Sequence, residues 1–255
     1  LTTLFFQVLS NYANDYGDGV KGTDDNRKGE KRMVGSGMIT HSQMRAAVYL
    51  FVFLSFVSSA LLSYLALIDQ GWPWVLLFIA LGSLAILSAV FYTVGDSAYG
   101  YSGWGDFFVL LFFGWVGVAG SYFIQTGEMD WSILMPASAV GLLATGVLNL
   151  NNMRDIQTDK IAGKFSIPVR IGLPYAKIYH IALILIAFDL ALIYANQHGG
   201  SAWRNLYWIC LPPLLWNIWS VTKAWQARDF EPLLKRLALT TLLFSISYGL
   251  GIYLS

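Results

Sequence analysis

The chain has 255 residues, of which 56% are hydrophobic and only 12% are charged, and its mean hydropathy is +0.55. A soluble domain usually carries about twice that charged fraction, so the composition excludes an ordinary soluble protein. The net charge of +1 is too small to indicate a polyanionic partner, and no nucleic-acid partner is expected.

Apolar segments of membrane length follow one another along the chain, and a spanning helix needs roughly 20 mostly apolar residues. The first segment, Leu1 to Tyr12, is too short to cross, and we interpret it as the lower half of a helix whose beginning is missing. The complete predicted spans are 46–68, 73–94, 106–125, 131–150, 178–197, 205–222 and 236–254. The expected fold is therefore all-α, a polytopic transmembrane helix bundle formed by a single domain over residues 1–255. Pro212 and Pro213 predict a kink or break within 205–222.

An acidic motif ends the first apolar segment. It consists of Asn11, Asn14, Asp15 and Asp18. Their spacing of i, i+3, i+4 and i+7 places them on one face of a helix. Acidic side chains at membrane depth are a functional-site hypothesis by default, because a bilayer strongly disfavours them. Asp24 and Asp25 extend the acidic run, either as further ligands or as part of a solvated loop without a role.

The turn over residues 95–105 carries glycines and aromatic residues but no Lys or Arg. It is either a tight turn between helices, with interfacial tyrosines such as Tyr101, or a cap over a cavity. Asp106 follows at the start of the next span, where the helix dipole alone would favour an acidic side chain.

A second acidic motif follows the span that ends at Leu150, with Asn152, Asp155 and Asp159 at i, i+3 and i+7. This spacing predicts one helical face, which is either a helix end reaching the aqueous interface or a metal-binding face. The repetition of the pattern favours the metal-binding interpretation. Oxygen ligands without a nearby His or thiolate indicate Mg²⁺ rather than Zn²⁺.

Basic residues lie beside this second motif: Arg154 within it, and Lys160, Lys164 and Arg170 after it. They either set the membrane topology only or neutralise a diphosphate held by the metal. If the spans alternate, all but one of the 16 Lys and Arg residues fall on one side of the membrane, the exception being Arg204. The positive-inside rule makes that side cytoplasmic, and it carries both acidic motifs.

Three strings in the chain, 10–22, 92–106 and 142–159, resemble the UbiA superfamily of intramembrane aromatic prenyltransferases. Within it they are similar to the MenA branch, which prenylates 1,4-dihydroxy-2-naphthoate in menaquinone synthesis. The resemblance covers essentially the whole chain. It implies a nine-helix fold whose first helix and part of the second are missing here. Where the superfamily often has a third Asp in the first motif, this chain has Gly22.

The resemblance implies that polyprenyl diphosphate and 1,4-dihydroxy-2-naphthoate give demethylmenaquinone, CO2 and diphosphate, on the cytoplasmic side of a bacterial inner membrane. The site must open to the lipid bilayer, because the polyprenyl tail is membrane-soluble. The implied ligands of Mg²⁺ are Asp15, Asp18, Asp155 and Asp159. The implied diphosphate and cofactor residues are Asn14, Tyr101, Asn152, Arg154, Lys160 and Lys164. We further expect the loop that holds Tyr101 and Asp106 to line the aromatic side of the cavity, with Asp106 as acceptor of a phenolic proton.

Two alternatives stay open. The aromatic acceptor could be another compound, such as 4-hydroxybenzoate or homogentisate. The chain could instead be a cation transporter that uses acids in the membrane interior as an ion path. Against transport, only Asp189 lies near the middle of a predicted span, whereas both acidic motifs lie at one membrane face.

Overall fold

The computed structural model of the protein describes residues 1–21, 33–95, 98–199 and 201–255. Asp24 and Asp25 lie outside the described residues. Within that described part the regular elements are all helical, and the expected all-α transmembrane fold is confirmed. The chain forms two compact units, one over 1–105, 123–128 and 157–166 and the other over the remaining residues.

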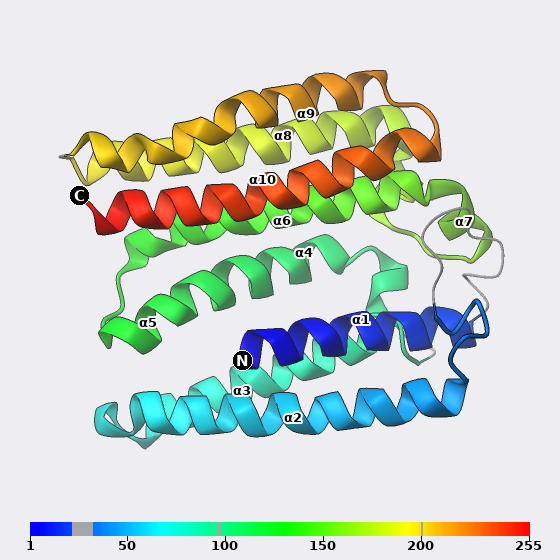
Figure 1. The fold of residues 1–255 in the computed structure, drawn as a ribbon, viewed down its shortest axis with the longest axis horizontal. Coiled ribbons are helices and arrows are strands. Elements are labelled where there is room, and N and C mark those ends of the chain that lie inside the picture. Colours follow the sequence, from blue (N-terminus) through cyan, green and yellow to red (C-terminus); the bar gives the residue numbers. More distant parts are fainter. Residues whose placement is uncertain (22–32, 96–97, 200) are drawn as a thin grey trace. The chain divides into compact units, whose positions relative to one another are not determined.

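The first unit is built on three helices that lie side by side, α1 (Thr2–Val20), α2 (His41–Leu67) and α3 (Trp72–Phe91) (Figure 1). Their apolar core joins one side chain from each helix, Leu9, Val48 and Ile86. Gly17 allows α1 to approach the end of α3, because a Cβ at Gly17 would lie 2.6 Å from Oγ1 of Thr93. The Thr93 hydroxyl then donates a hydrogen bond to the backbone oxygen of Ala13.

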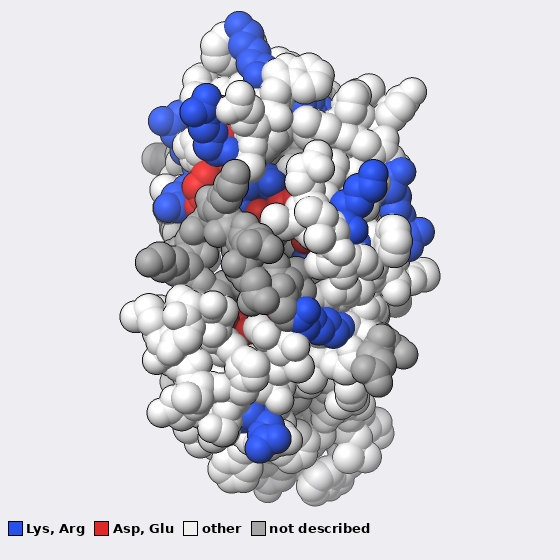
Figure 2. Space-filling view, turned by 90° about the vertical axis from the view of Figure 1, so that its right-hand side faces the viewer, with Lys and Arg blue, Asp and Glu red and all other residues white. Residues whose placement is uncertain are grey.

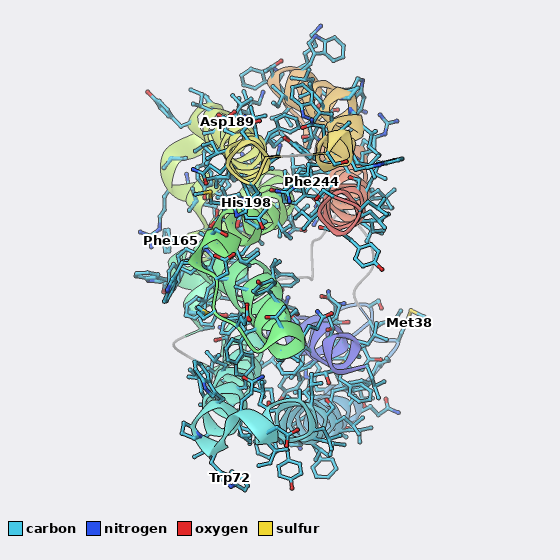
Figure 3. All side chains as sticks on the ribbon, turned by 90° about the vertical axis from the view of Figure 1, so that its left-hand side faces the viewer. Met38, Trp72, Phe165, Asp189, His198 and Phe244 are labelled. Carbon is cyan, nitrogen blue, oxygen red and sulfur yellow. The ribbon has the colours of Figure 1, made fainter. Side chains whose placement is uncertain are left out.

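The second unit contains four helices that pack on one another, α6 (Leu134–Arg154), α8 (Ile167–Gln197), α9 (Leu211–Lys223) and α10 (Ala227–Tyr253) (Figure 1). Their core holds fully buried Leu143, Ile184, Leu237 and Phe244, the last labelled in Figure 3. Because lipid tails are as apolar as these side chains, their burial stabilises the bundle through close packing rather than through removal from water.

Close backbone packing joins α6 to the preceding helix. That helix runs from Gly105 to Thr126 through α4 (Gly105–Val109), a π-helical stretch (Leu110–Ala119) and α5 (Gly120–Thr126). A Cβ at Gly114 would lie 2.7 Å from the backbone oxygen of Ala137 on α6. Small residues at such contacts let membrane helices approach each other closely.

Six helices in the described part of the chain are long and apolar enough to cross a membrane. They are His41–Gln70, Trp72–Phe91, Gly105–Thr126, Trp131–Arg154, Ile167–Gln197 and Ala227–Tyr253. The seventh predicted span, 205–222, is divided between a 3-10 helix (Ala202–Cys210) and the shorter α9. The predicted break therefore falls just before Pro212 and Pro213, which occupy the first turn of α9, where proline costs no hydrogen bond.

The second acidic motif is not one continuous helix, and this prediction is wrong. α6 ends at Arg154, Asp155 has φ −94° and ψ 8°, and a separate short helix, α7 (Ile156–Ile161), follows. Asp and Asn side chains compete for local hydrogen bonds and so favour helix ends. As a result Asp155 belongs to the second unit, and Asp159 belongs to the first.

Candidate functional site

The first acidic motif lies on α1, and the prediction of one helical face is confirmed. Asp15 and Asp18 are buried, whereas Asn11 lies at the exposed edge. The Asp15 carboxylate accepts hydrogen bonds from the backbone N–H groups of Met33 at 3.0 Å and Val34 at 3.3 Å. These bonds hold the chain that follows α1 against the motif.

Tyr101 connects the first motif to a distant part of the chain. Its hydroxyl donates a 3.0 Å hydrogen bond to Oδ1 of Asp18, and its backbone oxygen accepts from the Phe165 N–H at 2.8 Å. The ammonium of Lys21 lies 3.9 Å from the centre of the Tyr101 ring, within the range of a cation–π interaction. Both the ring and the hydroxyl of Tyr101 therefore face charged groups.

Lys164 and Asp159 complete the site of the first unit. The Lys164 N–H donates to the Asp159 backbone oxygen at 2.8 Å, in a turn that Gly163 allows with a φ of 71°. This turn brings Nζ of Lys164 to 3.7 Å from Oδ1 of Asp159. The Ser166 hydroxyl donates to the other carboxylate oxygen at 3.4 Å.

The charge of Lys164 is preserved although its side chain is buried. Burial lowers the pKa of its ammonium, but Tyr92, Asp159, Asp18 and Tyr101 raise it and prevail, so the net pKa is above the usual value for lysine. Lys164 is therefore a fixed cation that the surrounding carboxylates stabilise. We call the cluster of Asp15, Asp18, Tyr101, Asp159 and Lys164 the first-unit site.

The buried charges of the first-unit site are unequal. Asp15, Asp18 and Asp159 are buried carboxylates, and Lys164 is the buried cation among them, so their formal sum is −2. Buried carboxylates are stabilised by nearby cations. A divalent cation matches this need, and carboxylate oxygens are the ligands that Mg²⁺ prefers. No three His, Cys, Asp or Glu side chains of the described residues form a group that could hold a metal as they stand.

The second unit arranges its part of the second motif around Arg154. The Arg154 guanidinium binds both carboxylate oxygens of Asp155 at 2.7 Å and donates to Oε2 of Glu231 at 2.6 Å. It also donates to Oδ1 of Asn151 at 2.7 Å. Buried Asn152 has an Oδ1 atom with no hydrogen-bond donor in the described structure. We call the cluster of Asn151, Arg154, Asp155 and Glu231 the arginine cluster.

Asp106 also lies in the second unit and is buried. Its Oδ2 atom accepts a 2.9 Å hydrogen bond from the hydroxyl of Tyr179 on α8. Asp106 lies in the first turn of α4, so the dipole interpretation holds, but the carboxylate also has a specific phenolic partner.

The remaining predicted site residues differ in how far they are exposed. Lys160 and Arg170 are exposed, and Asn14 is half-buried beside Thr93, whose hydroxyl lies 3.4 Å from Oδ1 of Asn14. Basic side chains with acidic atoms between them are visible from the end at which α7 lies (Figure 2). Asp189 is exposed on α8 (Figure 3) and is not hidden in the core of its unit.

Two site residues were missed from the sequence, Glu231 and Tyr179. Each meets its partner across a long chain separation, Glu231 with Arg154 and Tyr179 with Asp106. Glu231 also lies four residues before Lys235, and this spacing is typical of an ordinary ion pair on the surface of a helix. No local spacing could have distinguished it.

The fold and these clusters define a multi-pass membrane protein with buried carboxylates paired to cations. Residues 1–246 match the UbiA prenyltransferase family, and the chain belongs to that family. The chain is 39% identical to the 1,4-dihydroxy-2-naphthoate octaprenyltransferase of Haemophilus influenzae, over 99% of this chain and 82% of that protein. It is 38% identical to the Escherichia coli enzyme of the same name, over 100% of this chain and 82% of that protein. The expected placement in the MenA branch is confirmed by these relatives.

A solved structure supports the fold. It comes from a study described as "Structural and mechanistic insights into the biosynthesis of Digeranylgeranylglyceryl phosphate synthase in membranes". It superposes with a TM-score of 0.60 at 16% identity, covering 98% of this chain and 82% of that one. At this identity the likeness concerns the fold alone.

Proposed function

We propose that the protein transfers a polyprenyl group from polyprenyl diphosphate to 1,4-dihydroxy-2-naphthoate, giving CO2, diphosphate and demethylmenaquinol, the hydroquinone that a separate two-electron oxidation converts to demethylmenaquinone. The observation that carries the proposal is the meeting of Asp18, Asp159 and Lys164 in one buried site, in a chain with naphthoate octaprenyltransferase relatives. A site with fixed cationic and anionic groups suits a diphosphate and its metal. The names of the relatives specify an octaprenyl donor, which is the first donor to test.

The residues present fit Mg²⁺, which we propose as the cofactor. The possible ligands are all oxygens, and the buried charge of the first-unit site is negative. Asp15, Asp18 and Asp159 of the first unit would hold the metal, and Asp155 is a further ligand that the family resemblance implies. When bound, Mg²⁺ would withdraw charge from the diphosphate and make it a better leaving group.

The protein's own residues bind and orient the donor. The fixed cation Lys164 binds the diphosphate, and the Tyr101 hydroxyl holds the Asp18 carboxylate in place. The hydrogen bond to Asp18 favours placing Tyr101 with the diphosphate, in the cofactor-binding role, and not with the aromatic ring. Asn14, Asn152, Lys160 and Arg154 are the further candidates for this role, with Arg154 already engaged by Asp155 and Glu231.

The transfer step needs no oxidant, because both hydroxyls of the acceptor stay in place and the product is the hydroquinone demethylmenaquinol. The allylic C–O bond of the donor breaks, and diphosphate leaves with the electron pair. The ring carbon that bears the carboxylate forms the new C–C bond, and departure of CO2 returns an electron pair to the aromatic ring. Apolar helices exclude water from the allylic cation, which would otherwise be hydrolysed.

On the acceptor side we propose Asp106, together with Tyr179, as the group that accepts or holds a phenolic proton of the naphthoate. A buried carboxylate already bonded to a phenol can bind another phenolic hydroxyl by the same chemistry. From the distribution of Lys and Arg, we propose that the site opens on the cytoplasmic side of a bacterial inner membrane.

Product analysis tests the function. The full-length protein, purified in lipid nanodiscs, is offered octaprenyl diphosphate and Mg²⁺ with 1,4-dihydroxy-2-naphthoate, 4-hydroxybenzoate or homogentisate in turn. Mass spectrometry should find demethylmenaquinol, or demethylmenaquinone after oxidation in air, with the first acceptor and no comparable product with the others. Preference for another acceptor would overturn the naphthoate assignment, and full activity in EDTA would overturn the magnesium assignment.

A further inference from the structure

A buried polar cluster in the second unit takes no part in the proposed reaction. Nε2 of His180 on α8 lies 2.9 Å from Oδ1 of Asn217 on α9, and Nδ2 of Asn217 donates to the Leu233 backbone oxygen at 3.2 Å. Because the Asn217 amide donates to a carbonyl, its Oδ1 must accept from His180. Nε2 of His180 therefore carries the proton, and Nδ1 of the neutral ring is an acceptor.

A second acceptor lies on the facing helix. Nδ2 of Asn149 on α6 donates to the Ala176 backbone oxygen on α8 at 3.1 Å, so Oδ1 of Asn149 is left as an acceptor. Asn149 and His180 are both fully buried, at 0% exposure. Neither Oδ1 of Asn149 nor Nδ1 of His180 has a hydrogen-bond partner in the described structure.

The helix geometry places the two acceptors next to each other. Asn149 contacts α8 at Ala176, and Gly146, about one turn earlier on α6, contacts α8 at His180. The two contacts are therefore about one helical pitch apart, roughly 5 Å. One molecule with two O–H groups can bridge acceptors at that separation, since each O–H···O or O–H···N bond spans about 2.8 Å.

Gly146 leaves the room that such a molecule needs. A Cβ at Gly146 would lie 3.7 Å from Cε1 and 3.9 Å from Nδ1 of His180, which are ordinary van der Waals distances. On its other side the same Cβ would meet Cδ2 of Leu237 at 3.3 Å. The absence of a side chain at Gly146 therefore leaves space for a group the size of a methyl, which is about the size of one water molecule.

We propose that one internal water molecule binds at this position and donates to Nδ1 of His180 and Oδ1 of Asn149. Bare acceptors are costly within a membrane-spanning bundle, because no bulk water can reach them. The water would join α6 to α8 one turn before Asn152, and the His180–Asn217–Leu233 chain continues the connection to α9 and α10. This site goes beyond the proposed function and does not depend on it.

The test compares alanine and serine at position 146 by thermal unfolding of the protein in nanodiscs. Gly146→Ala places a methyl group in the water's space and provides no donor, so we expect the Tm to fall by several degrees. Gly146→Ser has the same Cβ, and its hydroxyl can donate to Nδ1 in place of the water, so we expect a Tm above that of Gly146→Ala. Alanine is intrinsically the better helix former, so this order would be reversed at a site without bare acceptors.

The matched control is Gly249 on α10, beside which a new Cβ would meet nothing within 4 Å. There we expect Gly249→Ala to be at least as stable as Gly249→Ser. If no water binds at position 146, the Tm of Gly146→Ala should be at least that of Gly146→Ser, as at position 249. This result would overturn the proposal. In a His180→Leu background the serine advantage at 146 should disappear, and its persistence would also contradict the proposal. If His180→Leu does not accumulate, His180→Phe, which keeps a ring but has no acceptor, serves as the background.

Discussion

The first-unit site and the arginine cluster contain similar acidic motifs but compensate their charge differently. In the first unit, three buried carboxylates lie around one buried cation, Lys164. Neutral groups such as the Tyr101 hydroxyl donate further hydrogen bonds to these carboxylates. In the second unit, one guanidinium lies between two carboxylates and uses four hydrogen bonds to hold them and Asn151. Among the described side chains, the first-unit site thus has one cation for three buried carboxylates, whereas the arginine cluster holds its carboxylates in a fixed geometry.

The largest expected effect is the loss of a buried carboxylate in the first-unit site. Asp18→Asn and Asp159→Asn should each lower turnover by at least ~10²-fold, because each removes a charge that fixes the metal and its diphosphate. The matched control is Asp189→Asn, since Asp189 is exposed on α8 outside both clusters. Prenyl-transfer rates of the three variants, at equal expression, would decide it. Near-normal activity of Asp159→Asn would show that α7 contributes no essential residue to the site.

A comparison of buried Lys164 with exposed Lys160 distinguishes a specific contact with the diphosphate from a general effect of positive charge. Lys164→Gln should raise the KM for polyprenyl diphosphate by roughly 10–10²-fold, because a charge-assisted bond to a buried cation is lost. Lys160→Gln removes the same charge from an exposed position and should change the KM only a few-fold. Equal effects of the two substitutions would show that Lys164 acts only through net charge.

The pH dependence follows from the raised pKa of Lys164. A lysine whose folded pKa lies above its unfolded value contributes its full stability below the unfolded pKa and loses it only as the pH rises through the folded pKa. Between about pH 6 and 9, Lys164 therefore stays protonated. The KM for the donor in the wild-type protein should show no ionisation attributable to lysine in this range. A lysine-like loss of binding below about pH 9 that disappears in Lys164→Gln would contradict this assignment.

The arginine cluster is expected to respond more weakly and in a different parameter. Glu231→Gln frees one side of Arg154 and should lower kcat by roughly 10-fold, because Asp155 loses its fixed orientation. Lys235→Gln is the control, since Lys235 contacts the same carboxylate from an exposed position. Steady-state kinetics with each substrate varied would separate kcat from KM. If Lys235→Gln costs as much as Glu231→Gln, the helix surface and not Arg154 is responsible.

The smallest expected effect concerns Tyr101. Tyr101→Phe keeps the ring under Lys21 and removes the hydroxyl that donates to Asp18. The loss should be about 1 kcal/mol, seen as a roughly five-fold rise in the KM for polyprenyl diphosphate. A rise confined to the KM for the naphthoate would place Tyr101 on the acceptor side, as the sequence alone suggested.

The sequence predicts the helices well because the apolar length of a segment is a local property. The start of α3, the proline junction before α9 and the helical face of Asp15 and Asp18 all follow from local patterns. The helix break at Asp155 was missed, because the i, i+3, i+7 spacing of polar residues continues across it. The spacing does not show that the Asp155 carboxylate accepts a hydrogen bond from the neighbouring Arg154.

Contacts across long separations could not be predicted from spacing. Tyr101 was expected near the aromatic acceptor because of its loop's composition, but its hydroxyl lies against Asp18 of α1. The fixed cation could not be distinguished either, since Lys160 and Lys164 look alike in sequence and differ only in burial. Burial of Lys164 depends on the turn at Gly163 and on segments far along the chain.

A double-mutant cycle on Asp18 and Asp159 tests most directly whether the two acidic motifs act as one site. Prenyl transfer is measured for Asp18→Asn, Asp159→Asn and the double variant, with product quantified by mass spectrometry. If both carboxylates serve the same metal and diphosphate, the double variant should be about as slow as the slower single variant, because the second loss removes nothing further. Losses that multiply would show that Asp18 and Asp159 act independently, and would contradict the account.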